Sequence, residues 1–413
     1  MSLTQIADRQ KKPQSLAEAQ AFILHHFPPV VGLEWVAAAA GLSRILAKDI
    51  TAPVDLPRFD ASAMDGYAIH AADLEDDGRA NLGITGLSAA GHPPDWPLAR
   101  GHAARIFTGA ILPEGADRVV LQEHRRQADG RVQVAVPMGG KPHIRRRGED
   151  VRAGAIVLAA GTRLGAGHLA LLAALQCASL PVLRPLRVAL LSTGDELQEG
   201  AAPLARGRII DSNRPLLRAM LTSLGCSVAD LGIVPDVPEA LLAVLVEAAA
   251  AHDLIITSGG ASVGAADHLH RLIAQRGCME FWRLNIRPGR PVGLGDIDDC
   301  PILALPGNPM AAAVGFTLLG RRLIGRLSGA PAPQPEALML PLAHAAQKTP
   351  GRLDVLAARR MVLPDGQSGV VPLAVQGSAS LTALSQAEGL ILLPEPLDRV
   401  EAGALVAYVP FNG

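Results

Sequence analysis

Apolar and polar positions change their spacing several times along the chain, and each change marks a different kind of segment. From Ser15 to about Ala52 the spacing is helical, and Glu18 follows Ser15 at the distance of a capping box. From Pro53 to about Gly148, short apolar runs alternate with Gly, Pro and Asp, which predicts a small β domain. Its expected strands cover residues 66–70, 105–108, 118–122 and 131–136.

After this domain, from Glu149 on, comes a short β segment bounded by glycines, and then an uncharged stretch, Leu164–Leu183. Its length is close to that of a membrane span, but it contains polar residues such as His168 and consists mostly of Ala and Leu. We therefore interpret it as a buried or interface helix. Residues 15–52 and 149–185 are expected to form one elongated helical domain, into which the β domain, residues 53–148, is inserted.

Between Leu186 and about Ser328, continuous apolar strands alternate with amphipathic helices. This alternation predicts a doubly wound, mostly parallel sheet that is covered by helices on both faces. The expected strands are residues 187–191, 227–234, 253–257 and 302–305, and the expected helices are residues 215–224, 238–251 and 309–327.

The rest of the chain has the composition of a linker followed by a second β region. Ser328–Pro335 is rich in Pro and Ala, which is typical of an extended connection. Short apolar runs in residues 337–413 predict a small β-barrel or sandwich. With residues 186–328 as the α/β domain, the chain is expected to contain four domains.

Composition narrows the class of ligand. The chain has 413 residues, a net charge of -1 and 3% aromatic residues, so it lacks the basic surface and stacking platforms of a nucleic-acid binder. Its four cysteines form no C-x-x-C pair, which suggests neither a zinc site nor a disulfide framework and is typical of a reducing cytosol. The N-terminal residues do not read as a signal peptide. We expect a cytoplasmic protein that binds a small molecule, without nucleic-acid or membrane partners.

Three turns that contain glycine, two of them with Ser or Thr as well, follow the expected parallel strands. In such sheets, ligands bind outside the carboxyl ends of the strands, where glycines allow close approach to a phosphate and helix N-termini favour its charge. The three turns together predict a phosphate or nucleotide cradle, although each alone reads equally well as an ordinary strand-to-helix turn. Their residues are Ser192, Thr193 and Gly194, then Ser258, Gly259 and Gly260, then Pro306, Gly307 and Asn308.

Two carboxylates and three arginines lie close to these turns. Glu196 and Asp267 are placed to share a Mg²⁺ with phosphate oxygens, and the alternative is that they cap helices. Arg283, Arg287 and Arg290 flank a Pro-Gly pair and could together hold a polyanion. The alternative for the arginines is a solvated basic turn.

Read in order, these segments resemble the molybdopterin molybdenumtransferase family, which includes MoeA and the gephyrin E domain. The matching motifs extend over about residues 53–395. They are SAMDGYA at 62–68, TGA at 108–110, PEGAD at 113–117, GED at 148–150, STGDEL at 192–197, DSNR at 211–214, TSGGASVG at 257–264 with Asp267, PGNP at 306–309, Gly351-Arg352 and Gln376-Gly377-Ser378.

The resemblance implies a multidomain fold with a MogA-like α/β domain and a C-terminal β-barrel. It implies a homodimer whose active site is shared between subunits, so that Asp65 and Thr108 would act in trans. The implied reaction inserts molybdate into adenylylated molybdopterin, with Mg²⁺-assisted cleavage of the pyrophosphate bond and release of AMP. Implied partners are a molybdopterin adenylyltransferase and maturation factors of molybdoenzymes.

The resemblance also assigns roles to individual residues. Glu196 and Asp267 match the Mg²⁺ carboxylates, and the three turns match the nucleotide cradle. The remaining catalytic candidates are acids, arginines that would hold molybdate and the terminal phosphate, and two hydroxyl residues. They are Asp65, Thr108, Asp150, Asp236, Arg283, Arg287, Arg290, Arg352 and Ser378.

Some positions depart from the family pattern. Lysines are common where this chain has its three arginines, and a serine often stands at the position of Ala311. Ala61 replaces a common Asn, and Asp354 replaces a more usual Glu. Two other functions remain open at this point: adenylyl transfer to molybdopterin, and an interaction scaffold that has lost its chemistry. Retained acids at the motif positions argue against the scaffold.

Overall fold

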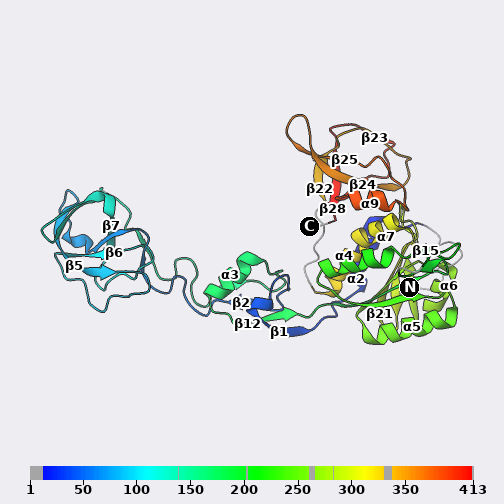
Figure 1. Cartoon of the computed structure of the whole chain (residues 1–413), viewed down its shortest axis with the longest axis horizontal. Coiled ribbons are helices and arrows are strands. Elements are labelled where there is room, and N and C mark those ends of the chain that lie inside the picture. Colours follow the sequence, from blue (N-terminus) through cyan, green and yellow to red (C-terminus); the bar gives the residue numbers. More distant parts are fainter. Residues whose placement is uncertain are drawn as a thin grey trace. The chain divides into compact units, whose positions relative to one another are not determined.

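The computed structural model describes residues 13–137, 139–200, 203–259, 266–281, 283–329 and 337–411. The chain divides into two compact units (Figure 1). One is Trp35–Val182, here called the small unit. The large unit consists of the described residues of Met1–Glu34 and Leu183–Gly413.

A six-stranded sheet forms the centre of the large unit. Its first four strands are parallel and correspond to the four that the apolar runs predict. Two antiparallel strands extend one edge and were not expected. In spatial order the strands are β16 (Ser227–Val234), β13 (Arg187–Thr193), β17 (Leu254–Ser258), β21 (Cys300–Leu305), β20 (Gly293–Ile297) and β18 (Gly277–Phe281).

The two unexpected strands contain glycine where their backbones approach closely. A Cβ on Gly295 would lie 1.9 Å from the carbonyl oxygen of Cys278, and one on Gly277 would lie 2.1 Å from that of Asp296. Glycine lowers strand propensity, so a pattern of apolar positions does not reveal these strands.

Helices cover both faces of this sheet, as predicted. Val188 and Leu190 of β13 lie in one hydrophobic cluster, and the alternate residues Ala189 and Leu191 lie in another. The helices are α4 (Asn213–Ser223), α5 (Pro238–Ala251), α6 (Ala266–Ile273), α7 (Pro309–Gly315) and α8 (Arg321–Leu327). Between α7 and α8 the helix continues through a π-helical turn, η4 (Phe316–Gly320).

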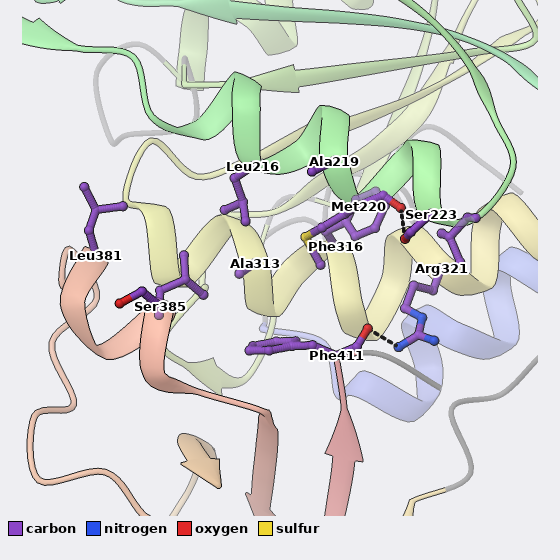
Figure 2. Close-up of a pocket in the computed structure, with 12 residues that line it drawn as sticks. Leu216, Ala219, Met220, Ser223, Ala313, Phe316, Arg321, Leu381, Ser385 and Phe411 are labelled. Carbon is purple, nitrogen blue, oxygen red and sulfur yellow. Dashed lines mark hydrogen bonds between the residues drawn. The ribbon is translucent and has the colours of Figure 1, made fainter.

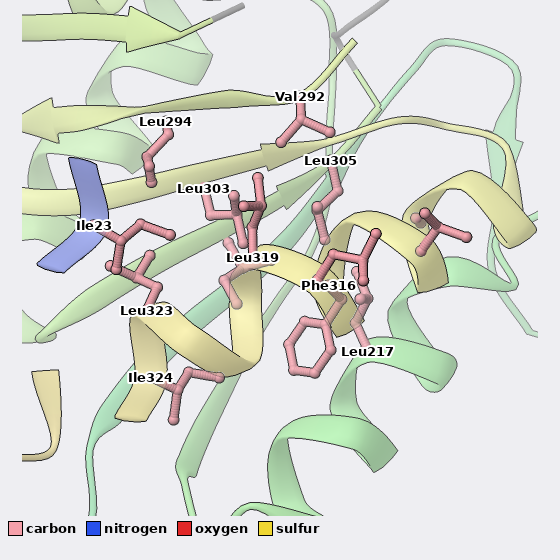
Figure 3. Close-up of a cluster of buried hydrophobic side chains, with 14 of the residues drawn as sticks. Ile23, Leu217, Val292, Leu294, Leu303, Leu305, Phe316, Leu319, Leu323 and Ile324 are labelled. Carbon is pink, nitrogen blue, oxygen red and sulfur yellow. The ribbon is translucent and has the colours of Figure 1, made fainter. Parts of the chain in front are cut away.

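Figure 3 shows the first cluster, in which Leu303 and Leu305 of β21 face Phe316 and Leu319 of η4. The N-terminal helix α2 (Leu16–His26) adds Ile23 to the same cluster. Its expected capping box is present, because Ser15 and Glu18 bond to each other's backbone N–H groups.

The C-terminal part of the large unit is rich in strands, as expected. Its sheet has the order β19 (Ile286–Arg287), β24 (Leu353–Val362), β26 (Gly389–Leu393), β28 (Leu405–Pro410) and β22 (Leu338–Pro341). β25 (Ser368–Pro372) also pairs with β24, and Leu342 forms a bridge to Val370. Shorter elements are β23 (Ala346–Gln347), β27 (Arg399–Val400) and α9 (Leu381–Gln386). Closure of these strands into a barrel stays a prediction.

The small unit contains the predicted β domain. Its sheet has the order β7 (Arg118–Leu121), β4 (Gly66–Ile69), β6 (His102–Ile106), β5 (Arg79–Ser88), β9 (Arg131–Ala135) and β8 (Arg125–Ala128). The four expected strands are present, and β5 and β8 are additional. Short elements around the sheet are β3 (Ala61–Ser62), η2 (Ala71–Asp73), η3 (Gln122–His124) and β10 (Ile144–Arg145).

The prediction of helix in residues 15–52 and 149–185 is confirmed at α2 and in the first half of the uncharged stretch, and it is wrong where strands form instead. The elements that follow are β1 (Leu33–Ala37), η1 (Ala38–Ala40), β2 (Ile50–Thr51), β11 (Ile156–Leu158), α3 (Ala166–Ala174) and β12 (Ser179–Leu183). The uncharged stretch breaks at Gln176, where φ is +59°, and its second half pairs with β1 as a strand. No helix in the described ranges has the length and apolar character needed to cross a bilayer.

Candidate functional site

The three turns of the predicted cradle meet at one edge of the central sheet. Gly259 follows β17, and its backbone N–H donates to the carbonyl of Leu305 at 3.1 Å. A Cβ on Gly259 would lie 2.1 Å from the carbonyl oxygen of Thr193, and one on Gly307 would lie 3.8 Å from the Cα of Gly259. Because φ of Gly259 is +91°, only glycine adopts this turn without strain. Gly260 lies outside the described residues.

Asn213 crosses this edge from the start of α4. Its side-chain Nδ2 donates to Ser258 Oγ and to the carbonyl oxygen of Gly307, both at 2.7 Å. The DSNR motif includes Asn213, but its spacing gives no sign of these contacts, because the partners lie 45 and 94 positions away.

Buried hydroxyl groups line the ends of two strands. Ser192 and Thr257 are fully buried, and their hydroxyl oxygens have no hydrogen-bond partner among the described residues. Thr193 Oγ1 donates to Asp236 Oδ1, which places the predicted acid Asp236 directly against the first turn. An edge with buried donors and two close glycine turns fits a polar ligand rich in phosphate oxygens.

Glu196 lies on the loop after β13. A Cβ on Gly194 would lie 2.7 Å from Glu196 Oε2, so the carboxylate packs over the glycine backbone. The carboxylate is exposed and has no bonded partner within the part of the chain that the structure describes.

A short parallel pair, β14 (Leu197–Gln198) with β15 (Ile209–Ile210), holds the loop of Glu196. Arg214 adds ion pairs to Asp211, Asp230 and Glu199. The side chain of Arg214 is 11% exposed, so these pairs are partly shielded from water and fix the loop more firmly than surface pairs would.

For Asp267, the second predicted metal ligand, the structure describes the backbone but not the side chain. Asp267 lies in the first turn of α6, and its side chain is outside the described part. Among the described residues, no group of three or more His, Cys, Asp or Glu side chains forms a metal cage.

The predicted arginines gather where β19 pairs with β24. Leu284 and Arg290 join by a backbone bond of 2.8 Å, which folds the 283–290 segment back on itself. Asn285 Nδ2 donates to the carbonyl of Gly351 at 2.9 Å and so brings Arg352 to the same place. The four arginines of this region, Arg283, Arg287, Arg290 and Arg352, are exposed.

Arg287 differs from the other three arginines. Its Nη2 donates to Asp354 Oδ2 at 2.7 Å, and the Asp354 side chain is 3% exposed. The guanidinium groups of Arg283, Arg290 and Arg352 have no ion-pair partner within the described ranges. The Asp that departs from the family pattern therefore neutralises one of the predicted oxyanion ligands.

Ser378 lies next to the third turn. Its carbonyl oxygen accepts from the backbone N–H of Met310 at 3.0 Å, and its Oγ lies 3.4 Å from Asn308 Nδ2. Gln376 fixes the same loop, because its side chain bonds to both backbone groups of Ala357 at 2.9 Å. The structure thus brings Ser378 to the predicted cradle.

In the small unit, Asp65 and Thr108 form a pair. Asp65 Oδ1 accepts from the backbone N–H and the Oγ1 of Thr108, both at 2.8 Å. These two hydrogen bonds, with a smaller effect of the Arg105 charge, hold the pKa of Asp65 below its usual range. Asp65 is therefore an anion near neutral pH.

Asp150 lies on the loop between β10 and β11 of the small unit. It lines an open cleft of about 500 Å³ together with Glu149 and Arg152. The preceding basic run is already paired, since Arg146 binds Asp60 at 2.5 Å and Arg147 binds Asp55 at 2.6 Å. That run is a structural network and offers little free charge to a ligand.

An apolar pocket of about 620 Å³ lies apart from all predicted site residues. Figure 2 shows Met220 of α4, Phe316 of η4 and Phe411 around it, with Arg321 at one end. Arg321 donates to the carbonyl of Pro410 at 2.9 Å, and burial lowers its pKa. The guanidinium thus caps the end of β28.

Comparison with protein families gives consecutive matches along the chain. The MoeA N-terminal region (domain I and II) matches residues 14–175. A domain described as "Probable molybdopterin binding domain" matches residues 189–326, and the MoeA C-terminal region (domain IV) matches residues 339–411.

Individual proteins match over nearly the same length. The molybdopterin molybdenumtransferase of Haemophilus influenzae is 37% identical over 402 residues, which cover 96% of this chain and 98% of the relative. A molybdopterin molybdenumtransferase of Nostoc is 38% identical over 70% of this chain and 68% of its own. The crystal structure of a molybdopterin biosynthesis MoeA protein from Pyrococcus horikoshii has 30% identity and a TM-score of 0.80, covering 97% of this chain and all of its own.

Proposed function

The chain belongs to the molybdopterin molybdenumtransferase family, whose members act in molybdenum cofactor biosynthesis, and we propose that it inserts molybdate into adenylylated molybdopterin with release of AMP. Molybdopterin and molybdate are its substrates. The observation that carries the detailed reaction is the meeting of three glycine turns at one sheet edge, with Asp236 bonded to Thr193 and Glu196 beside Gly194.

In this proposal the sheet edge binds the nucleotide end of the substrate. Gly194, Gly259 and Gly307 let the backbone reach the phosphates, and the backbone N–H groups after the strands supply donors. Asp236 accepts the Thr193 hydroxyl and so fixes the first turn.

Glu196 and Asp267 would hold a Mg²⁺ between the protein and the phosphates. The carboxylate of Glu196, exposed and without a bonded partner among the described residues, fits this role, because Mg²⁺ prefers oxygen ligands and keeps its remaining positions for water and phosphate. When bound, Mg²⁺ supplies charge neutralisation for the phosphate oxygens as the pyrophosphate bond is cleaved.

The unpaired arginines would position molybdate. The guanidinium groups of Arg283, Arg290 and Arg352 lie in one region and have no ion-pair partner in the described part of the chain, so charge-assisted hydrogen bonds from them would orient an oxyanion. Arg287 contributes less in this proposal, because Asp354 already holds its charge. Molybdate oxygen is anionic, so the arginines need to position the attacking group more than to activate it.

We also propose a homodimer in which Asp65 and Thr108 of one subunit serve the substrate bound by the other, as the family resemblance implies. Mixed dimers test this arrangement. An Asp65→Asn subunit combined with a Glu196→Gln subunit should recover part of the activity that each homodimer lacks. Absence of recovery would place both residues in one subunit's own site.

A molybdopterin adenylyltransferase would supply the substrate, and molybdoenzyme maturation factors would accept the product.

The test of the proposed reaction supplies adenylylated molybdopterin, Mg²⁺ and molybdate to the purified protein. We expect molybdate-dependent AMP release that matches molybdenum incorporation. Glu196→Gln should lower the rate at least about a hundredfold, since a lost metal ligand removes transition-state charge stabilisation. The matched control is Glu247→Gln, an exposed carboxylate on α5. ATP consumption on free molybdopterin without metal entry would instead show adenylyl transfer.

A further inference from the structure

We propose that Asn213 is a positioning residue of the nucleotide cradle, whose side-chain amide fixes the turn after β17 against the turn after β21. This inference rests on the proposed function, because it assigns the two turns to substrate binding. It concerns the spacing between the turns and does not require Asn213 to touch the ligand.

The side-chain amide of Asn213 donates hydrogen bonds to one residue of each turn. Nδ2 lies 2.7 Å from Ser258 Oγ and 2.7 Å from the carbonyl oxygen of Gly307. A primary amide has two N–H groups, and their directions are fixed by its plane. Ser258 and Gly307 are therefore held at a set separation.

The other end of the Asn213 side chain is also anchored. Its backbone N–H donates to Asp211 Oδ1 at 3.1 Å, and Asp211 is itself paired with Arg214. Asn213 is 5% exposed and Asp211 is 7% exposed, so water competes little for these bonds. These bonds of Asn213, here called the clamp, join the start of α4 to the ends of β17 and β21.

Within the described ranges, no other side chain bonds to both turns. Below the turns, β17 and β21 pair as far as Ser258 and Leu305, and one further backbone bond, from the N–H of Gly259 to the carbonyl of Leu305, is 3.1 Å long. The turns approach each other with Gly259 and Gly307, which carry no side chain that could pack between them. Loss of the Asn213 amide would leave the two turns joined only through the end of the β17–β21 ladder and the bond from Gly259 to Leu305.

The decisive variant is Asn213→Asp, which keeps the size and shape of the side chain. A carboxylate oxygen would replace the amide nitrogen and face the carbonyl of Gly307, so a donor would become a repelling acceptor. The matched control is Asn81→Asp in the small unit, where the side-chain oxygen only accepts a bond from Arg131 at 3.1 Å and can continue to do so.

The first measurement is hydrogen–deuterium exchange of the protein without ligand. We expect faster exchange in peptides 254–259 and 302–308 of Asn213→Asp and no change there in Asn81→Asp. Unchanged exchange in both peptides would overturn the clamp. This readout does not depend on the reaction, so it stands even if the proposed function fails.

The second measurement is the dissociation constant for AMP with Mg²⁺, taken well below the melting temperature of each variant. We expect AMP to bind about tenfold more weakly to Asn213→Asp, which corresponds to about 1.4 kcal/mol. If wild-type protein binds AMP and the variant binds it within twofold, the inference fails while the proposed function stands. If wild-type protein binds no AMP, the nucleotide role of both turns fails.

A purely structural role would lower the melting temperature and leave AMP affinity and the KM for adenylylated molybdopterin unchanged. We expect KM to rise and kcat to stay within about twofold, since the clamp acts on binding. Should Asn213→Asp fail to fold, Ser258→Ala removes one of the two acceptors. It should then raise the AMP dissociation constant by a smaller factor, and an unchanged constant would overturn the inference.

Discussion

At the scale of single residues, the carboxylates of the large unit divide into those that arginines bind and those that stay free. Asp253 and Asp354 are bound, whereas Glu196 is exposed and unpaired in the described part. The sequence singles out Glu196, Asp236 and Ser378, and the structure places them beside the three turns, but the motifs do not show which acid is already neutralised. The Arg287–Asp354 pair joins positions 67 residues apart, so a local pattern does not reveal it.

Asp253 gives a prediction on pH dependence. Burial would raise its pKa, but hydrogen bonds from Arg184 and Arg187 outweigh burial and hold the pKa well below its usual range. Because the folded pKa lies below the unfolded value near ~3.9, the pair stabilises the fold above that pH and loses this effect as pH falls.

We therefore expect Asp253→Asn to lower the free energy of unfolding by about 3 kcal/mol near pH ~7, with a smaller difference from wild type below pH ~4. Urea unfolding at the two pH values measures both differences. A deficit that stays constant on acidification would show that the charge of Asp253 contributes nothing.

Cys300 gives a prediction on thiol reactivity. Burial raises its pKa to about 12, and its Sγ lies 3.5 Å from the carbonyl of His252. Since only the thiolate reacts, an aromatic disulfide reagent near pH ~8 should leave Cys300 unmodified in the native protein and label it after unfolding. Peptide mapping by mass spectrometry identifies the labelled cysteine, and labelling of native Cys300 would contradict its burial.

At the scale of elements, alternation and continuity of apolar residues predict the strands that are buried on both faces. β13, β17 and β21 lie where these runs predict them, and α5 and the partly exposed edge strand β16 have the predicted bounds. The same reasoning fails for residues 35–52 and for the second half of the uncharged stretch, residues 179–183, where Ala and Leu runs read as helix. There β1 and β12 pair with each other, and pairing between distant segments outweighs the local helix propensity of Ala and Leu.

Gly259 gives a prediction for the turn after β17. Gly259→Ala should destabilise the protein by at least about 2 kcal/mol and abolish AMP binding, because its Cβ would overlap the Thr193 carbonyl. Gly366 is the matched control: its φ is +83°, and no atom lies within 4 Å of its added Cβ. Gly366→Ala should cost only about 1 kcal/mol of backbone strain and keep AMP binding. Equal losses in the two variants would attribute the effect to φ alone.

At the scale of the whole molecule, the described chain forms two compact units with separate hydrophobic cores. Linker composition and the change in texture at residue 53 both suggest several domains. Neither shows that α2 joins the core of the α/β sheet, because that packing depends on contacts with residues such as Leu323 of α8, far along the chain.

Separate cores predict separate unfolding transitions. Calorimetry should resolve at least two, since two-state behaviour is a property of single cooperative units. Leu82→Ala in the small unit should remove about 3 kcal/mol from one transition, and Leu190→Ala in the large unit should act on another. A single transition that both substitutions shift equally would show one cooperative body.

The pairing of β19 with β24 has a consequence for the exchange of domains between related chains. Val355, Leu390 and Val409, which follow the proline-rich linker, lie in the same hydrophobic cluster as Val188 and Leu254. The linker marks a domain boundary in the sequence, but the residues before and after it share one hydrophobic core. Recombination at residues 328–337 would separate two halves of one core, so the C-terminal region is expected to be inherited together with the α/β domain and not exchanged as a module.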